Sequence, residues 1–112
     1  MTDFSTQSLD NGVQVVRTVP RLNMVTAQRL TAMVGELVAN GHARVVIDLT
    51  DTVFIDSSGL GALVSCLKKT RQAGGDLRIA GPTQQVEMVL DLTNLNRVLQ
   101  PSQTVEIASA AF

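Results

Sequence analysis

The feature that most constrains the fold is an apolar run near the middle of the chain. Residues 45–49 read VVIDL, and polar residues flank the run on both sides. A strand with one solvated face alternates between polar and apolar residues, whereas a strand covered on both faces is apolar almost throughout. The run therefore predicts a strand over residues 44–49 at the centre of a sheet.

Strand and helix patterns alternate around this strand. Residues 3–8 and 13–19 are expected to form a hairpin, because Asn and Gly in the turn DNG at 10–12 tolerate positive φ. Helical spacing of apolar residues predicts a first helix over 22–38, with Leu22 as its first apolar position and NG at 40–41 as its end. A second helix is expected from about Ser57 to GG at 74–75.

The end of the chain adds smaller elements. A strand is expected over 77–80, and a third helix passes through Val86, Val89 and Leu90. Residues 94–98 are expected to form a turn and a short strand, and residues 102–111 a weak final helix. The order of elements predicts a single α/β domain over residues 1–112, with about four helices packed on a mixed sheet.

Composition excludes several classes of function. The formal net charge is -1, which gives little long-range attraction for nucleic acid or an anionic membrane. With no Trp, no Tyr and three Phe, the chain has no aromatic platform for stacking bases. No apolar run approaches the roughly 20 residues that span a bilayer, and no signal peptide is visible. One cysteine, Cys66, expected to be a buried apolar side chain, fits a protein of the reducing cytoplasm.

The second helix begins with FIDSSGLG at residues 54–61, which places an acid and two serines at a strand-to-helix junction. In one interpretation Ser57, Asp56 or Ser58 caps the helix by accepting a hydrogen bond from an amide of the first turn. Capping does not explain Gly59 and Gly61, each of which destabilises a helix by roughly 0.5–1 kcal/mol relative to Ala. The small residues therefore indicate an exposed, flat helix start with room for a partner.

Several motifs for catalysis and ligand binding are missing from the sequence. A serine-hydrolase elbow needs glycine two residues before the serine, where this chain has Ile55 and Asp56. The one histidine, His42, lies in a polar turn. No Gly-Lys-Ser/Thr phosphate loop is present, and no His/Cys cluster is available for a metal. We therefore expect a protein that is not an enzyme and binds no metal.

The stretch DSSGLG at 56–61, preceded by VVIDL at 45–49 and FI at 54–55, resembles the anti-sigma factor antagonists of the STAS superfamily. The resemblance covers nearly the whole chain, including the opening hairpin, GG at 74–75 and the late stretch VEMVLDLTNLNRVL. It implies a single STAS domain, in which the helices pack largely on one side of a small mixed sheet.

The resemblance also implies a phosphorylation switch. In the family, a partner that is both an anti-sigma factor and a serine kinase phosphorylates the serine after the motif's aspartate, which is Ser57 here. The unphosphorylated antagonist binds the anti-sigma factor and so releases a sigma factor, and a PP2C-type phosphatase reverses the modification. ATP and metal ions belong to those two enzymes, so no cofactor is implied for this chain. Partner contacts are expected at Arg21, Asn23, Asp56, Ser57, Ser58, Gly59 and Gly61.

The chain departs from the family pattern after its second strand. Family members usually carry Gly-Glu-hydrophobic-Asp there, whereas residues 20–23 of this chain are PRLN. The loss of two acids and the gain of one base is either neutral change on a surface turn or a change of partner specificity, because charge at the rim of an interface affects partner choice.

Two other roles are open to a STAS domain. In the first, the chain is an accessory subunit of a membrane lipid-transport ATPase complex and a constitutive structural partner there. In the second, it binds a small ligand, for which the sequence offers no motif. The second serine and Gly61 favour the antagonist over the transport subunit.

Overall fold

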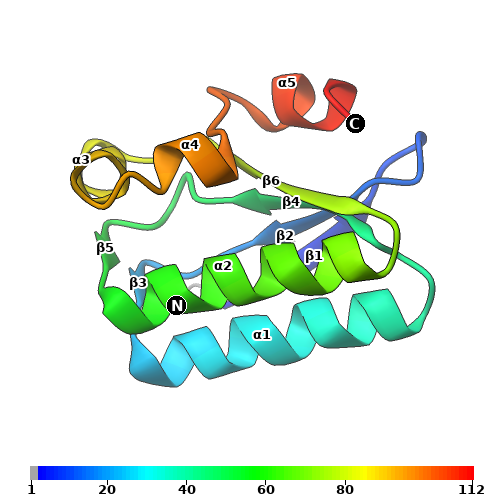
Figure 1. Cartoon of the computed structure of the whole chain (residues 1–112), viewed down its shortest axis with the longest axis horizontal. Coiled ribbons are helices and arrows are strands. Elements are labelled where there is room, and N and C mark those ends of the chain that lie inside the picture. The colour runs from blue at the N-terminus through cyan, green and yellow to red at the C-terminus, as the bar shows by residue number, and fades with distance from the viewer. Residues whose placement is uncertain (1–2) are drawn as a thin grey trace.

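A four-stranded sheet forms the centre of the computed structural model, which describes residues 3–112 (Figure 1). Strands β1 (Ser5–Ser8) and β2 (Gln14–Arg17) form the predicted antiparallel hairpin, with Gly12 in its turn at φ 85°. Strands β4 (Arg44–Asp48) and β6 (Asp76–Ala80) extend the sheet in parallel, which gives the order β1-β2-β4-β6. The mixed sheet of the predicted α/β class is therefore confirmed.

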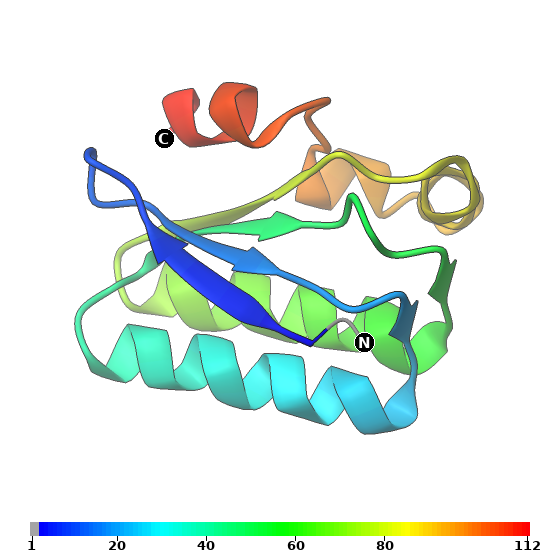
Figure 2. The same ribbon diagram turned by 180° about the vertical axis from the view of Figure 1, so that it is seen from behind.

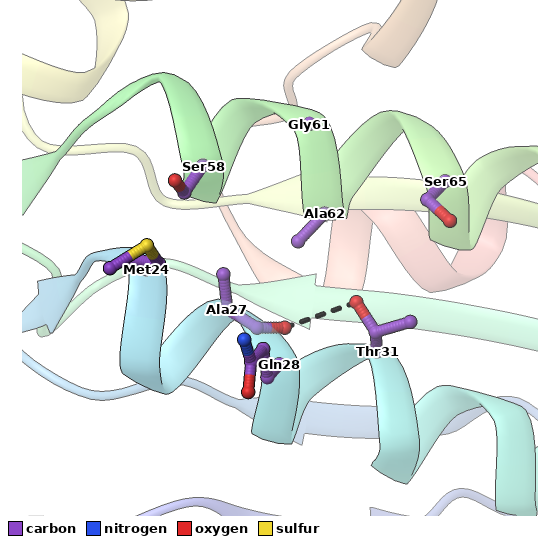
Figure 3. Close-up of a pocket in the computed structure, with 8 residues that line it drawn as sticks. All are labelled: Met24, Ala27, Gln28, Thr31, Ser58, Gly61, Ala62 and Ser65. Carbon is purple, nitrogen blue, oxygen red and sulfur yellow. Dashed lines mark hydrogen bonds between the residues drawn. The ribbon is translucent and has the colours of Figure 1, made fainter.

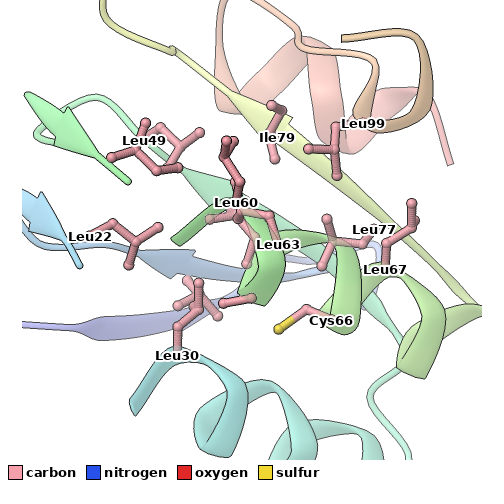
Figure 4. Packing of buried hydrophobic residues seen from close by; sticks show 14 of the residues in the cluster. Leu22, Leu30, Leu49, Leu60, Leu63, Cys66, Leu67, Leu77, Ile79 and Leu99 are labelled. Atoms are coloured by element: carbon pink, nitrogen blue, oxygen red, sulfur yellow. The ribbon is translucent and has the colours of Figure 1, made fainter. Parts of the chain in front are cut away.

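Strand β4 is covered on both faces, as the apolar run predicts. Val45 and Ile47 belong to the larger core cluster beside the two long helices, whereas Val46 belongs to a smaller cluster on the other face. Figure 4 shows the larger cluster, in which leucines from the second long helix meet Leu77 and Ile79 of β6. Cys66 lies fully buried in this cluster, as expected.

Helices α1 (Met24–Ala39) and α2 (Ser57–Gln72) lie side by side under one face of the sheet and run in the same direction (Figure 1). The final helix, α5 (Val105–Ala110), lies across the opposite face, where Ala108 packs against Val15 and Val46 (Figure 2). Helix α3 (Gln84–Leu92) lies near the end of the molecule where α1 and α2 begin (Figure 1).

The end of the chain differs from the sequence prediction at residues 94–98. A turn is present, but it leads into the one-turn helix α4 (Asn96–Leu99) rather than a strand. Instead of a strand, the segment after α4 forms an isolated parallel bridge to β6, between Ser102 and Ala80. With α4, residues 3–112 form five helices. Burial of Leu99 explains this turn of helix, because it anchors the segment in the core.

Two strands of two residues each were missed by the sequence analysis. β3 (Arg21–Leu22) and β5 (Phe54–Ile55) pair in parallel as a second sheet. Leu22 therefore lies in a strand and not in the first helix, where its apolar spacing had placed it. Its side chain is fully buried, so it satisfies the same pattern of burial from a different backbone conformation.

Candidate functional site

The second sheet brings the starts of α1 and α2 together. Arg21 pairs with Phe54 and Leu22 with Ile55, and each strand leads directly into a helix. The Asp56 amide also donates to the Leu22 carbonyl at 3.3 Å. The two helices therefore begin at the same end of the molecule, which brings the residues of the PRLN and DSSGLG segments into one region.

Asp56 is the cap of α2. Its backbone is extended (φ -110°, ψ -173°), and its Oδ1 accepts a hydrogen bond from the Gly59 amide at 3.0 Å. Its carbonyl accepts from the Leu60 amide, also at 3.0 Å. Of the three residues that the sequence offered as caps, the aspartate therefore takes this role, and Ser57 is the first residue of the helix.

The two serines are left without a structural task in the described part of the chain. Ser57 is exposed and Ser58 is half-buried, and neither hydroxyl forms a hydrogen bond within residues 3–112. The amides of the first two helical positions have no acceptor inside the helix, which makes this end electropositive. The Ser57 hydroxyl is thus presented to solvent beside amides that have no acceptor within the helix.

The two glycines of the motif differ in their surroundings. A Cβ built on Gly59 would lie 2.4 Å from the Leu22 carbonyl oxygen and 2.7 Å from Cγ1 of Ile55. Gly59 is therefore required where α2 crosses β3 and β5. A Cβ built on Gly61 would have no neighbour within 4 Å. Because the fold does not need a glycine at position 61, the open surface there is available to a partner.

A groove runs between α1 and α2 from this point. Its volume is about 470 Å³, and Figure 3 shows side chains of the two helices facing each other across it. Ser58 opens the α2 side of the groove, while Thr31 on α1 donates its hydroxyl to the Ala27 carbonyl at 3.0 Å. The lining residues are Met24, Ala27, Gln28, Thr31, Ser58, Gly61, Ala62 and Ser65.

The same fold occurs in known proteins. The family model of the STAS domain matches residues 8–108. The chain belongs to the STAS domain family. Its resemblance to the anti-sigma factor antagonists of that family is confirmed by relatives that carry this name.

One such relative is a protein of Thermotoga maritima named as an anti-sigma factor antagonist, 36% identical over 73 residues, which are 65% of this chain and 65% of the relative's length. BtrV of Bordetella bronchiseptica, named in the same way, is 30% identical over 81% of this chain and 78% of its own. The crystal structure of a T. maritima antagonist superposes with a TM-score of 0.88 at 29% identity, covering 96% of this chain and 92% of that one. SpoIIAA in its unphosphorylated form shares the fold, with a TM-score of 0.80 at 19% identity and coverage of 94% and 91%.

In this STAS domain, Arg21 and Asn23 have distinct positions beside the motif. Asn23 caps α1: its Oδ1 accepts from the amides of Val25 (3.1 Å) and Thr26 (3.2 Å), and the Thr26 hydroxyl accepts from the Asn23 amide at 2.9 Å. Arg21 is exposed, with its guanidinium carbon 4.4 Å from the centre of the Phe54 ring. Of the two, Arg21 is the side chain that remains available at the surface.

Three apolar residues near the motif were missed by the sequence analysis. Met24 and Val25 at the start of α1 are 64% and 67% exposed, and Val53 before β5 is 60% exposed. Helical spacing could have predicted the exposure of Val25. Nine residues at about 100° each place it on the side of α1 opposite the buried Val34. An apolar side chain on the solvent side of a helix is a candidate contact for a partner.

Metal-binding clusters and membrane-spanning helices are both absent from residues 3–112. No group of three His, Cys, Asp or Glu side chains in this range lies close enough to hold a metal ion. Every helix in the same range is too short or too polar to cross a membrane.

Proposed function

We propose that this STAS domain is an anti-sigma factor antagonist controlled by phosphorylation of Ser57. In its unphosphorylated form it binds an anti-sigma factor that is also a serine kinase, and a sigma factor is released. Phosphorylation of Ser57 by that kinase ends the interaction, and a PP2C-type phosphatase restores it. The relatives named as anti-sigma factor antagonists support the first part of this cycle.

The observation that carries the proposal is the separate roles of Asp56 and Ser57. Asp56 accepts the hydrogen bond that caps α2, so the fold does not need the Ser57 hydroxyl. A capping serine would have to break its own hydrogen bond before it could reach a kinase. Ser57, by contrast, is exposed at the first position of the helix, where its hydroxyl can receive a phosphate without any change in the domain.

The phosphate itself would be stable at this position. It adds roughly -1.5 to -2 charges at pH 7. Apart from the capping Asp56, whose Oδ1 accepts from the Gly59 amide, neither α1 nor α2 has an acidic residue at its start, and unpaired amides of a helix start interact favourably with an anion. Phosphorylation therefore leaves the domain folded, and its effect falls on the interface with the partner.

The interface supplies the free-energy difference for the switch. Exposed Met24, Val25 and Val53 lie at the same end of the molecule as Ser57. A partner that covers these apolar side chains excludes water from the surface around the serine. A phosphate buried there loses its hydration, and a poorly paired buried charge costs several kcal/mol. A difference of about 2.8 kcal/mol already weakens binding about a hundredfold.

The predicted contact residues act in two ways in this proposal. Arg21, Ser57, Ser58 and Gly61 present side-chain or open backbone surface to the partner. Asp56, Asn23 and Gly59 hold the two helix starts in place by capping or by close packing. Arg21 gives the rim a positive charge where the family usually has acids, so the cognate partner is expected to carry a carboxylate opposite it.

Phosphopeptide mapping after incubation with the cognate kinase and ATP tests the assignment of Ser57. Ser57→Ala should abolish phosphorylation, whereas Ser58→Ala should retain it, and circular dichroism should show both variants folded. Ser58→Ala is the matched control because it removes the neighbouring hydroxyl. Phosphate found on Ser58 alone would show that the assignment is one residue wrong. A stable transporter complex that is indifferent to both substitutions would favour the accessory-subunit role instead.

A further inference from the structure

Strand β1 is an open edge of the main sheet. It pairs with β2 on one side, and within residues 3–112 no strand pairs with its other side. All four of its side chains, Ser5–Ser8, are exposed. Natural edge strands are commonly protected against pairing by Lys, Pro or a bulge, and residues 5–8 contain none of these. The edge is thus open to a further strand.

The hairpin determines which backbone groups of β1 face this open side. The Leu9 amide donates to the Val13 carbonyl at 2.9 Å, which makes Leu9 and Val13 a hydrogen-bonded pair. Such pairs alternate with non-bonded pairs along an antiparallel ladder. Gln7 and Ser5 therefore also form hydrogen-bonded pairs with β2, opposite Val15 and Arg17. The amides and carbonyls of Thr6 and Ser8 point away from β2, toward the open edge.

A groove lies beside these unpaired groups. It has a volume of about 230 Å³ between β1 and α1, and Thr6 forms its strand side. Phe4, two residues before Thr6, packs against the core cluster beneath the sheet, so Thr6 also faces α1. A strand added to β1 would place every second side chain over this groove. The helix side of the groove consists of Met33, Glu36, Leu37 and Asn40.

The charges around the groove indicate what kind of strand fits it. Glu36 is exposed and forms no ion pair within residues 3–112. Asp10 follows β1, while Asp3 before it is paired with Arg29. Half-buried Met33 and Leu37 offer apolar contact beside Glu36 in the same groove. The complementary strand therefore carries a basic side chain with apolar neighbours on the same face.

We infer that the β1 edge binds an extended basic segment of a partner protein as a fifth strand of the main sheet. Backbone hydrogen bonds to Thr6 and Ser8 supply affinity, and the groove with Glu36 supplies specificity, as in other cases of strand addition. A second copy of this chain fits less well, because its own β1 edge, Ser5–Ser8, carries no basic side chain to place opposite Glu36.

The experiment uses the peptide acetyl-TVSKTVS-amide, in which both valines and the lysine share one face of a strand. Titration into ¹⁵N-labelled protein should shift the amide signals of Thr6 and Ser8 and of residues 33–37 in a saturable way. Acetyl-TVSETVS-amide should bind about fivefold more weakly, as expected for one exposed charge pair. Glu36→Lys should reverse the preference between the two peptides.

Two variants at one position separate strand addition from other binding. Thr6→Pro removes the outward amide and should weaken binding about tenfold or more, whereas Thr6→Val keeps the amide and should bind like the native protein. Thermal unfolding checks that both are folded. Absence of saturable shifts at millimolar peptide, shifts away from β1, or unchanged binding by Thr6→Pro would overturn the inference. A dimer in sedimentation that Thr6→Pro dissociates would also overturn it, because the edge would then belong to a second copy.

Discussion

The starts of α1 and α2 are built alike but use their polar side chains differently. Each follows a two-residue strand, and each has an extended capping residue, Asn23 for α1 and Asp56 for α2. At α1, Asn23 accepts from two amides, and Thr26 accepts from the Asn23 amide in return. At α2, Asp56 accepts from one amide, and Ser57 and Ser58 form no hydrogen bonds through their hydroxyls within residues 3–112.

The difference separates a structural helix start from a functional one. The α1 start uses both of its polar side chains to hold the helix, so what it offers a partner is the apolar surface of Met24 and Val25. The α2 start is held by one aspartate and by the close fit of Gly59. Its two serines and the surface at Gly61 add nothing to the fold, and that is where we place the contact with the anti-sigma factor.

The largest expected effect distinguishes the two glycines of α2. Gly59→Ala should destabilise the domain by about 2–3 kcal/mol, because its Cβ would overlap the Leu22 carbonyl. Gly61→Ala should instead stabilise the helix by up to about 1 kcal/mol, since it meets no neighbour and removes a glycine. Urea denaturation of both variants measures the difference. If Gly59→Ala were as stable as the native protein, the close packing of α2 on β3 would not exist.

The caps should rank in the order of the hydrogen bonds that they accept. Asn23→Ala should cost about 1–2 kcal/mol, Asp56→Ala about 1 kcal/mol, and Ser57→Ala less than about 0.5 kcal/mol. The expected ranking follows from two amides on Asn23, one on Asp56 and none on the Ser57 hydroxyl in the described chain. The same urea titrations provide the values. A cost of 1 kcal/mol or more for Ser57→Ala would mean that the serine contributes to the cap and is not free for modification.

The smallest expected effect concerns the buried thiol of Cys66 on α2. Burial raises the pKa of its thiol from 9.0 to about 11, against the opposing effects of the Lys69 charge and a Thr31 hydrogen bond. A raised pKa in the folded state means that the contribution of the neutral thiol to stability is present below pH 9 and is lost as the pH rises toward 11. Between pH 8 and 9, where this loss begins, the native protein should therefore lose roughly 0.3–0.4 kcal/mol more stability than Cys66→Ala. An identical decline in both proteins would contradict the buried position.

The sequence predicted the fold wherever burial followed a regular period. The VVIDL run identified the central strand, and alternating turns and helices led to the α/β class. The sequence prediction failed at Leu22, because a strand of two residues is too short to show a periodic pattern. A buried leucine fits a helix and a strand equally well. The prediction also failed at residues 96–99, where tertiary burial of Leu99 stabilises a turn of helix that local propensity does not predict.

The candidate site was only partly predictable for a related reason. The motif indicated the right segment, but spacing alone could not decide which of Asp56, Ser57 and Ser58 is the cap. Nor could it show that Gly59 packs against the chain's own backbone while Gly61 faces open space. Both distinctions depend on β3, which lies more than thirty residues earlier in the sequence than Gly59.

Calorimetric titration of the cognate anti-sigma factor tests the central claim most directly. It compares the native protein, the Ser57-phosphorylated protein and Ser57→Asp, with Ser58→Ala as a control and circular dichroism of each. We expect phosphorylation to weaken binding at least about a hundredfold, Ser57→Asp to fall between the two forms because it carries less charge, and the helical signal to remain unchanged. Equal affinity of the native and phosphorylated forms would contradict the account, and loss of helix on phosphorylation would replace it with a conformational switch.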